Sequence, residues 1–318
     1  MDVKNVFLNG NLSEEVYMKP PPGLSSPPNK DLGTLSYFLG LEISSSSDGY
    51  YLTHANYISD MLSQANLTNC KTIDMPTELN VRLNLHDAEP LRDFTLYRYL
   101  VGSLVYLTVT RPDISYVVHQ VSQFIAAPCS THFSAILLIL RYLKGTLFQW
   151  LHFSSQSPLQ LHAYTDADWA GDPTDRRSTT GYCFLLGTSL ISWHSKKQFV
   201  AALSNTDAEY RTLADTSSEL LWLRWLLQDI GVSFSSATPI YYDNISAIQI
   251  AYNDVYHERT KHIEIDCHFV CHHLLQGSLQ LHSIMSHDQF ADLFTKSHPP
   301  GRFRNLVSNL KMVFRTPP

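Results

Sequence analysis

The sequence lacks the features of a membrane-spanning or secreted protein. It has no run of about 18 or more apolar residues, the length that a membrane-spanning helix needs. Its start, "MDVKNVFLNG", has neither the basic residues nor the apolar run of a signal peptide. Its five cysteines are scattered and odd in number, which favours a reducing compartment over a disulfide framework. We therefore expect an intracellular protein, cytoplasmic or nuclear, that has no membrane partner.

Positive charge is also scarce. The chain has 23 Lys and Arg against 29 Asp and Glu, which gives a formal net charge of −6 at pH 7. This balance argues mildly against binding nucleic acid by bulk electrostatics, because that binding needs clustered Lys and Arg. It still allows an acidic site that recruits divalent cations. With 318 residues and an apolar share of 44%, the chain can bury a sizeable globular core.

The first half of the chain is predicted to be mainly helical. Residues 19–29 carry five prolines and cannot form a helix or a central strand, so they separate a short N-terminal piece from the rest. A β-hairpin with its turn at Ser47 to Gly49 and then a helix are predicted next. Apolar residues at helical spacing predict further helices in 96–110, 114–127 and 132–146, the last ending at Gly145.

The second half is predicted to be an α/β unit. Residues 159–166 alternate like a half-buried strand, and 179–195 predict a hairpin that turns at Gly187-Thr188. A long amphipathic helix is expected from Thr206 to Ile230. Strands at 239–243 and 279–286 then alternate with helices at 244–253, 258–277 and 287–297. We therefore expect a mixed five-stranded sheet with flanking helices.

Acidic residues gather where the first of these strands ends. The stretch "LHAYTDADWAGD" places Asp166, Asp168 and Asp172 within seven residues. Because like charges this close repel, either water solvates them or a cation lies among them. Read as an EF-hand loop the stretch has Arg177 where the last Glu belongs, and read as an aspartyl-phosphate phosphatase it is followed by a hairpin, which is the wrong context. We expect Asp168 and Asp172 to be solvated loop residues, or at most outer contributors to a site.

Four carboxylates from four predicted elements could converge. Asp166 and Asp243 each end a strand, and they emerge at one sheet edge if the two strands are neighbours. Glu209 and Asp292 each lie in the first turn of a helix. Such a set suits two Mg²⁺ ions about 4 Å apart.

Each of these four acids also has a purely structural explanation. Glu209 has capping-box spacing from Thr206, although Ser204 and Asp207 have the same spacing and could leave it free. Asp243 could cap the following helix, and Asp292 could be favoured there by the helix dipole. Taken singly these explanations are favoured; taken together, the order and spacing of the four favour a metal site.

Two other features are expected to be structural. The run "CHFVCHH" (267–273) places cysteines and histidines at i and i+4 on a helix, but a structural zinc site needs four ligands and the sequence has no partner cluster. We therefore expect an ordinary, partly buried helix there. Trp193, Trp222 and Trp225 are expected in the core.

At this point a family resemblance becomes visible. The blocks "AYTDADWAGDPTDRRSTTGYCFLLGTSLISWHSKKQ", "ALSNTDAEYRTLA", "YYDNISAI", "HERTKHIEIDCHFV" and "DQFADLFTKS" together resemble the ribonuclease H domain of copia-type LTR retrotransposons. The resemblance covers about residues 157–298. It implies an RNase H fold that hydrolyses the RNA strand of RNA–DNA hybrids. It also implies a metal site made of Asp166, Glu209, Asp243 and Asp292, holding two Mg²⁺ ions with Mn²⁺ as a substitute, and no small-molecule cofactor.

The upstream region resembles the same Pol polyprotein. "MDVKNVFLNGNLSEEVYMKPPPG" resembles the reverse transcriptase segment with the first catalytic aspartate, here Asp2, whereas the later "Y-V-D-D" motif is absent between Lys30 and Asp31. We therefore expect an internally deleted fragment without DNA polymerase activity. Its expected parts are a palm remnant (1–30), a reverse transcriptase C-terminal or connection-like region (31–156), the RNase H-like domain (157–298) and a C-terminal tail (299–318).

The resemblance leaves some alternatives open. The expected function is a retrotransposon-derived RNase H, and the alternative is a catalytically silent relic or a fragment that binds nucleic acid or protein. His262 or His287 could assist proton transfer or product release. The oligomeric state stays open.

Overall fold

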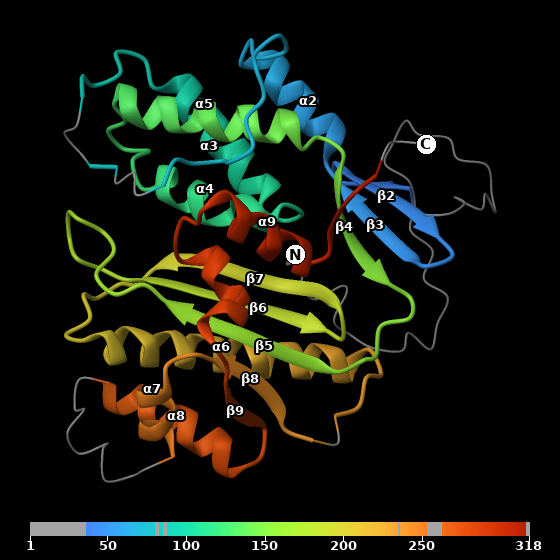
Figure 1. Cartoon of the computed structure of the whole chain (residues 1–318), viewed down its shortest axis with the longest axis vertical. Helices are drawn as coiled ribbons and strands as arrows, with labels where there is room; N and C mark the ends of the chain where they lie inside the picture. Colours follow the sequence, from blue (N-terminus) through green and yellow to red (C-terminus); the bar gives the residue numbers. More distant parts are fainter. Residues whose placement is uncertain (1–35, 80–82, 85–87, 235, 253–262, 316–318) are drawn as a thin grey trace, which may run out of the picture.

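The computed structural model describes residues 36–79, 83–84, 88–234, 236–252 and 263–315. The expected palm remnant with Asp2, and His262, lie outside the described residues. The described strands form two five-stranded sheets. In Figure 1 one sheet crosses the middle of the molecule with helices above and below it, and the other lies at the right.

The first sheet is antiparallel and joins segments from both ends of the chain. Its strand order is β1-β2-β3-β4-β10, in which β1 is Tyr37–Phe38, β2 Leu41–Ser46, β3 Gly49–Thr53, β4 Gln149–Ser154 and β10 Met312–Phe314. The predicted turn between β2 and β3 is confirmed. Gly49 is required there, because its φ of 144° suits glycine and an added Cβ would lie 2.0 Å from the Phe153 carbonyl oxygen.

The predicted helices of the first half are present. They are α2 (Ala55–Gln64), α3 (Thr95–Leu107), α4 (Ser115–Ser122) and α5 (Ser130–Gly145). A short 3₁₀ helix that was not predicted, η1 (Pro112–Ile114), lies between α3 and α4. The proline-initiated turn η1 separates α3 from α4, because Pro112 fixes its own φ and cannot continue the preceding helix. The buried pair of Arg111 and Asp113, 2.7 Å apart, anchors this corner.

The second sheet has the expected mixed topology. Its order is β7-β6-β5-β8-β9, in which β5 is Leu161–Ala167, β6 Thr179–Leu186, β7 Ser189–Lys197, β8 Thr238–Tyr242 and β9 Leu279–Ser283. The first three strands pair antiparallel, whereas β8 is parallel to both β5 and β9. The expected α/β, RNase H-like sheet is confirmed by this strand order.

The helices of the second half mostly match the predictions. They are α6 (Asn205–Asp229), α7 (Ile245–Ala251) and α8 (Glu264–Leu275). The single helix predicted for 287–297 is wrong: this segment forms two 3₁₀ helices, η4 (Ser286–Asp288) and η5 (Phe290–Phe294). The segment between them is fixed by Gln289, whose side chain accepts from the Ala291 amide and donates to the Thr165 carbonyl.

Within the expected C-terminal tail (299–318), the described residues form secondary structure. Residues Pro300–Asn309 form helix α9, and β10 follows and pairs with β4. Phe303, Leu306 and Val307 of α9 are buried in the core around α3, α4 and α5. The C-terminal residues of the described chain therefore add a strand to the first sheet and side chains to the core of the first half.

The second sheet is covered on both faces, which explains the nearly complete burial of β6. Alternate side chains of this strand point to opposite faces. Cys183 and Leu185 join the core formed by the helices of the first half and α9, whereas Tyr182 and Phe184 join the core under α6 and α8. One core therefore joins residues on both sides of the expected domain boundary at 156/157, and the boundary itself stays a prediction.

Two of the tryptophans expected in the core lie at the surface. Trp222 and Trp225 of α6 are 51% and 64% exposed, so that expectation is wrong for them. Trp193 is partly buried, and its indole N–H donates to the Thr108 carbonyl. In the described part of the chain, no helix combines the length and the apolar character needed to cross a membrane.

Candidate active site

Two of the four predicted carboxylates lie at the same edge of the second sheet. Asp166 is the penultimate residue of β5, and Asp243 directly follows the parallel neighbour β8. Parallel neighbours end at a common edge, as expected from the sequence. Asp243 does not cap α7, because Asn244 does so through the Ala247 amide. The Asp243 carboxylate instead accepts a hydrogen bond of 2.8 Å from the Ser286 hydroxyl.

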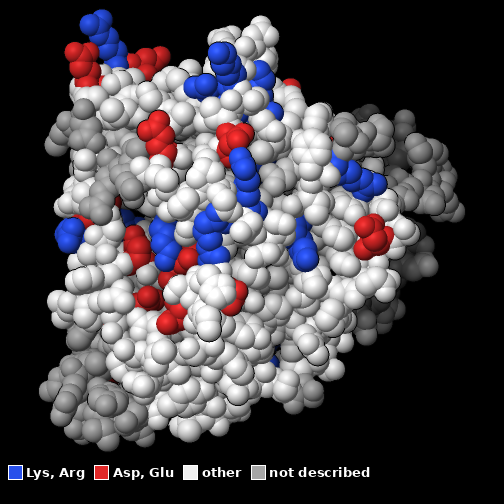
Figure 2. All heavy atoms as spheres, in the orientation of Figure 1, with Lys and Arg blue, Asp and Glu red and all other residues white. Residues whose placement is uncertain are grey.

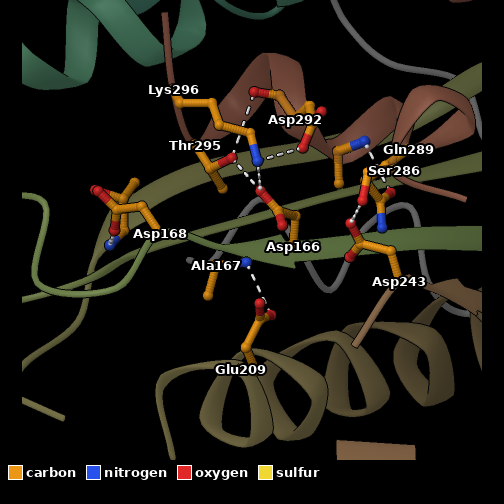
Figure 3. A network of polar contacts seen from close by, with 12 residues as sticks. Asp166, Ala167, Asp168, Glu209, Asp243, Ser286, Gln289, Asp292, Thr295 and Lys296 are labelled. Carbon is orange, nitrogen blue, oxygen red and sulfur yellow. Dashed lines mark hydrogen bonds and ion pairs between the residues drawn. The ribbon is translucent and has the colours of Figure 1, made fainter. Parts of the chain in front are cut away.

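Glu209 approaches this edge from the α6 face of the sheet (Figure 3). The N-terminus of α6 is capped by Ser204, which accepts from the Asp207 amide, so Glu209 is free of that task as predicted. Its Oε2 accepts from the Ala167 amide at 3.1 Å and from the Tyr242 hydroxyl at 2.8 Å. These two contacts attach the buried Glu209 carboxylate to the ends of β5 and β8.

Asp292 approaches from the opposite face, on η5. This short helix packs closely against β6 at Gly181, where an added Cβ would lie 2.5 Å from Thr295 Cγ2. Gly181 is also the register partner of Asp166. A glycine is therefore needed at this point for η5 to reach the end of β5. The Thr295 hydroxyl donates a short hydrogen bond to Asp166 Oδ2 and so ties η5 to the strand.

Lys296 lies between Asp166 and Asp292 (Figure 3). Its Nζ is 3.3 Å from Asp166 Oδ2 and 2.6 Å from Asp292 Oδ1. Arg302 of α9 contacts the other Asp292 oxygen at 3.3 Å. The chain thus supplies its own positive charge to two of the predicted metal ligands.

The site concentrates buried negative charge. Burial raises the pKa of Asp166, opposed by the Lys296 ammonium and reinforced by the charges of Asp292 and Asp243. Burial likewise raises the pKa of Glu209, and the nearby charge of Asp166 adds to the effect. A cation bound here would relieve both the desolvation and the mutual repulsion.

The other two acids of the stretch at 161–172 have specific contacts with the protein. Asp168 is half-buried and accepts a short hydrogen bond from the Thr179 amide. Burial raises its pKa to about 7, opposed by that hydrogen bond. Asp172 organises its loop by accepting from the Thr174 amide, and it forms an ion pair of 2.6 Å with Lys197. Neither is simply a solvated loop residue.

The remaining candidates do not join the site. His287 is exposed and lies 3.2 Å from Asp288. Cys267 and Cys271 on α8 are buried and form no disulfide. Across the part of the chain that the structure describes, no three His, Cys, Asp or Glu side chains are grouped so that they could hold a metal ion. The four carboxylates approach the same edge of the sheet. Their side chains are not, however, preorganised as a metal-binding site.

The donor set nevertheless fits a hard divalent cation. All four groups are carboxylates, the oxygen ligands that Mg²⁺ and Mn²⁺ accept. Asp292 Oδ1 is buried, and its close polar partner among the described residues is the Lys296 ammonium at 2.6 Å. A buried carboxylate oxygen that faces only a cation is suited to a metal ion.

Three residues of the site were missed in the sequence: Thr295, Lys296 and Gly181. Lys296 follows Asp292 by four residues, a spacing typical of ion pairs, and this signal was available. The role of Gly181 depends on which segment crosses β6, and a sequence pattern does not show that.

The visible face of the molecule carries mixed charge. Figure 2 shows Lys and Arg side chains interspersed with Asp and Glu in a band across the middle of this face. Among the described residues in this view, no broad field of one sign covers the surface. This agrees with the acidic balance of the whole sequence.

Comparison with known proteins identifies the origin of the chain. It is 43% identical over 289 residues, or 91% of its length, to the retrovirus-related Pol polyprotein from transposon RE1 of Arabidopsis thaliana. It is 37% identical over 283 residues to the corresponding polyprotein from transposon TNT 1-94 of Nicotiana tabacum. The chain belongs to the retrovirus-related Pol polyproteins of copia-like transposons. It spans 20% and 21% of these two relatives, so the activities of a whole Pol polyprotein are not attributed to it.

The other comparisons give shorter or weaker similarities. An uncharacterized mitochondrial protein of Arabidopsis thaliana, AtMg00810, is 42% identical over 193 residues, which is 80% of its length. No family model matches the chain. Among solved structures, the N-terminal RNase H domain of a Mycobacterium tuberculosis protein matches 47% of the chain at 11% identity and a TM-score of 0.31. At that score the RNase H-like assignment of this Pol segment depends on its own strand order.

Proposed function

We propose that this Pol segment hydrolyses the RNA strand of RNA–DNA hybrids with the help of two Mg²⁺ ions. The observation that carries the proposal is the arrival of four carboxylates at one sheet edge from four elements: β5, the end of β8, α6 and η5. Asp166, Glu209, Asp243 and Asp292 would hold the ions, and Mn²⁺ could substitute. When bound, the ions would activate a water for attack on the phosphorus and stabilise the leaving oxygen.

The chain's own residues would orient these ligands. Thr295 holds Asp166 from one face, and the Ala167 amide and the Tyr242 hydroxyl hold Glu209 from the other. Such supporting hydrogen bonds fix ligand orientation and raise the precision of a site. The products would carry 5′-phosphate and 3′-hydroxyl ends. RNA would be distinguished from DNA through contacts to 2′-hydroxyls across the minor groove of the hybrid.

A nuclease assay on a defined hybrid tests the proposal. The full chain is incubated with a labelled RNA strand annealed to DNA, in Mg²⁺, Mn²⁺ or EDTA. We expect cleavage with a divalent cation and none in EDTA. Asp166→Asn should lower the rate at least about 100-fold, because it removes a charged ligand at the centre of the site. Asp229→Asn, at an exposed position of α6, is the matched control and should cleave normally.

A catalytically silent relic that binds nucleic acid or protein is the second candidate. The observation that favours it is Lys296, which lies where a divalent cation would bind Asp166 and Asp292. A folded protein that cleaves no hybrid under any cation would favour this candidate. Cleavage that persists in EDTA or in Asp166→Asn would contradict the two-ion proposal. In either case we expect no primer extension, because the "Y-V-D-D" motif is missing from the sequence.

A further inference from the structure

Lys296 is a cation of the chain itself that lies between two of the proposed metal ligands (Figure 3). Its ammonium is 3.3 Å from Asp166 and 2.6 Å from Asp292. The two carboxylates come from β5 and η5, and Asp166 and Asp292 are 126 residues apart in the chain. An ammonium in this place therefore neutralises two acids that would otherwise repel each other.

The Lys296 side chain is placed so that it can leave. The carboxylate side chains are only 4% and 7% exposed, whereas the Lys296 side chain is 46% exposed. The Lys296 ammonium thus contacts buried carboxylate oxygens, whereas much of its flexible aliphatic chain is in contact with solvent. Lys296 also lies just beyond the end of η5, so a change of its side-chain rotamer would not disturb that helix.

Other contacts would keep Asp166 in place after such a movement. Asp166 Oδ2 accepts from the Thr295 hydroxyl, and Gln289 ties the segment before η5 to the Thr165 carbonyl. Asp292 keeps the contact of its Oδ2 with Arg302. The site could therefore release Lys296 without losing its arrangement.

We propose that Lys296 occupies the cation position of the free protein and gives it up when a divalent cation binds. The ammonium and a divalent cation cannot share the same carboxylate oxygens, since their charges repel at contact distance. Lys296 thus stabilises the ion-free protein and lowers its apparent affinity for the ion. The inference depends on the proposed function in one respect, because it takes Asp166 and Asp292 as ion ligands.

Metal binding without substrate tests this exchange. Mn²⁺ is titrated into the full chain and free Mn²⁺ is followed by electron paramagnetic resonance, while thermal unfolding is recorded in EDTA and in Mg²⁺. Lys296→Met should lower Tm in EDTA and strengthen Mn²⁺ binding by about tenfold, the factor expected if about a tenth of the wild type has Lys296 displaced. A merely structural role would lower Tm without strengthening Mn²⁺ binding.

Matched variants separate charge from size. Lys296→Arg keeps the positive charge and should bind Mn²⁺ as weakly as the wild type. Lys71→Met removes an exposed lysine elsewhere and should change neither Tm nor Mn²⁺ binding. Lys296→Gln repeats the neutral substitution if the methionine variant does not fold.

The outcomes distinguish this inference from the proposed function. Unchanged or weaker Mn²⁺ binding in both neutral variants would overturn the exchange. Absence of Mn²⁺ binding in the wild type and in the neutral variants would overturn the exchange and the proposed ion site together. Stronger Mn²⁺ binding in the neutral variants, in a protein that cleaves no hybrid, would support the exchange and overturn only the nuclease proposal.

Discussion

At the scale of single residues, Asp168 shows how burial sets the pH dependence of the ion-free protein. Burial raises its pKa from 3.8 to about 7, so the folded protein keeps a proton that the unfolded chain releases between these values. The resulting stabilisation is fully present below the unfolded pKa. It is lost as the pH rises through the folded pKa.

Asp168→Asn should therefore stabilise the protein at high pH. Asparagine has the same shape, can accept from the Thr179 amide and carries no charge to bury. In EDTA we expect the variant to exceed the wild type by about 4 kcal/mol at pH 8 and to come close to it near pH 4. Urea unfolding at pH 4, 6 and 8 measures the difference. A constant difference at all three values would show that Asp168 does not titrate in this range.

At the scale of elements, the sequence predicted the helices and strands that show a regular apolar pattern within their own residues. The amphipathic patterns of α3, α5 and α6, and the alternation in β5, identified these elements correctly. Elements fixed by distant partners were missed. The strand β4 depends on β3 and β10, and the 3₁₀ form of η5 depends on Gln289 and on its close approach to Gly181. The four carboxylates could be named from their places at strand ends and helix starts, but their contacts with Thr295 and Lys296 could not.

Helix α9 allows a direct test of whether the C-terminal residues are part of the core. Leu306 is fully buried in the core with α3, α4 and α5, whereas Asn305 beside it is exposed. Leu306→Ala should lower the free energy of unfolding by about 2–5 kcal/mol, because it leaves a cavity in a packed core. Asn305→Ala should change it by less than about 0.5 kcal/mol. Equal and small effects in urea unfolding would mean that residues 300–309 are a tail after all.

At the scale of the whole molecule, the two sheets are joined by a shared core. Trp193 of β7 donates to the Thr108 carbonyl, and the Lys197 amide donates to His119 Nε2 on α4 at 2.9 Å. These contacts connect the helices of the first half to β7, the strand at the edge of the RNase H-like sheet. The helices of the first half thus cover one face of that sheet. One hydrophobic core contains residues from both sides of the predicted boundary at 156/157.

Residues 157–298 alone should therefore fail to fold stably. In the isolated segment Leu185, Leu190, Leu293 and Phe294 would lose the cover of the helices of the first half and of α9. Burying each such side chain contributes about 1.5–3 kcal/mol, so together they approach the net stability of about 5–15 kcal/mol that a domain has. Size-exclusion chromatography and thermal unfolding of this segment beside the full chain measure the effect. A monomeric segment with a cooperative transition near that of the full chain would show instead that the RNase H-like sheet is stable without its upper layer.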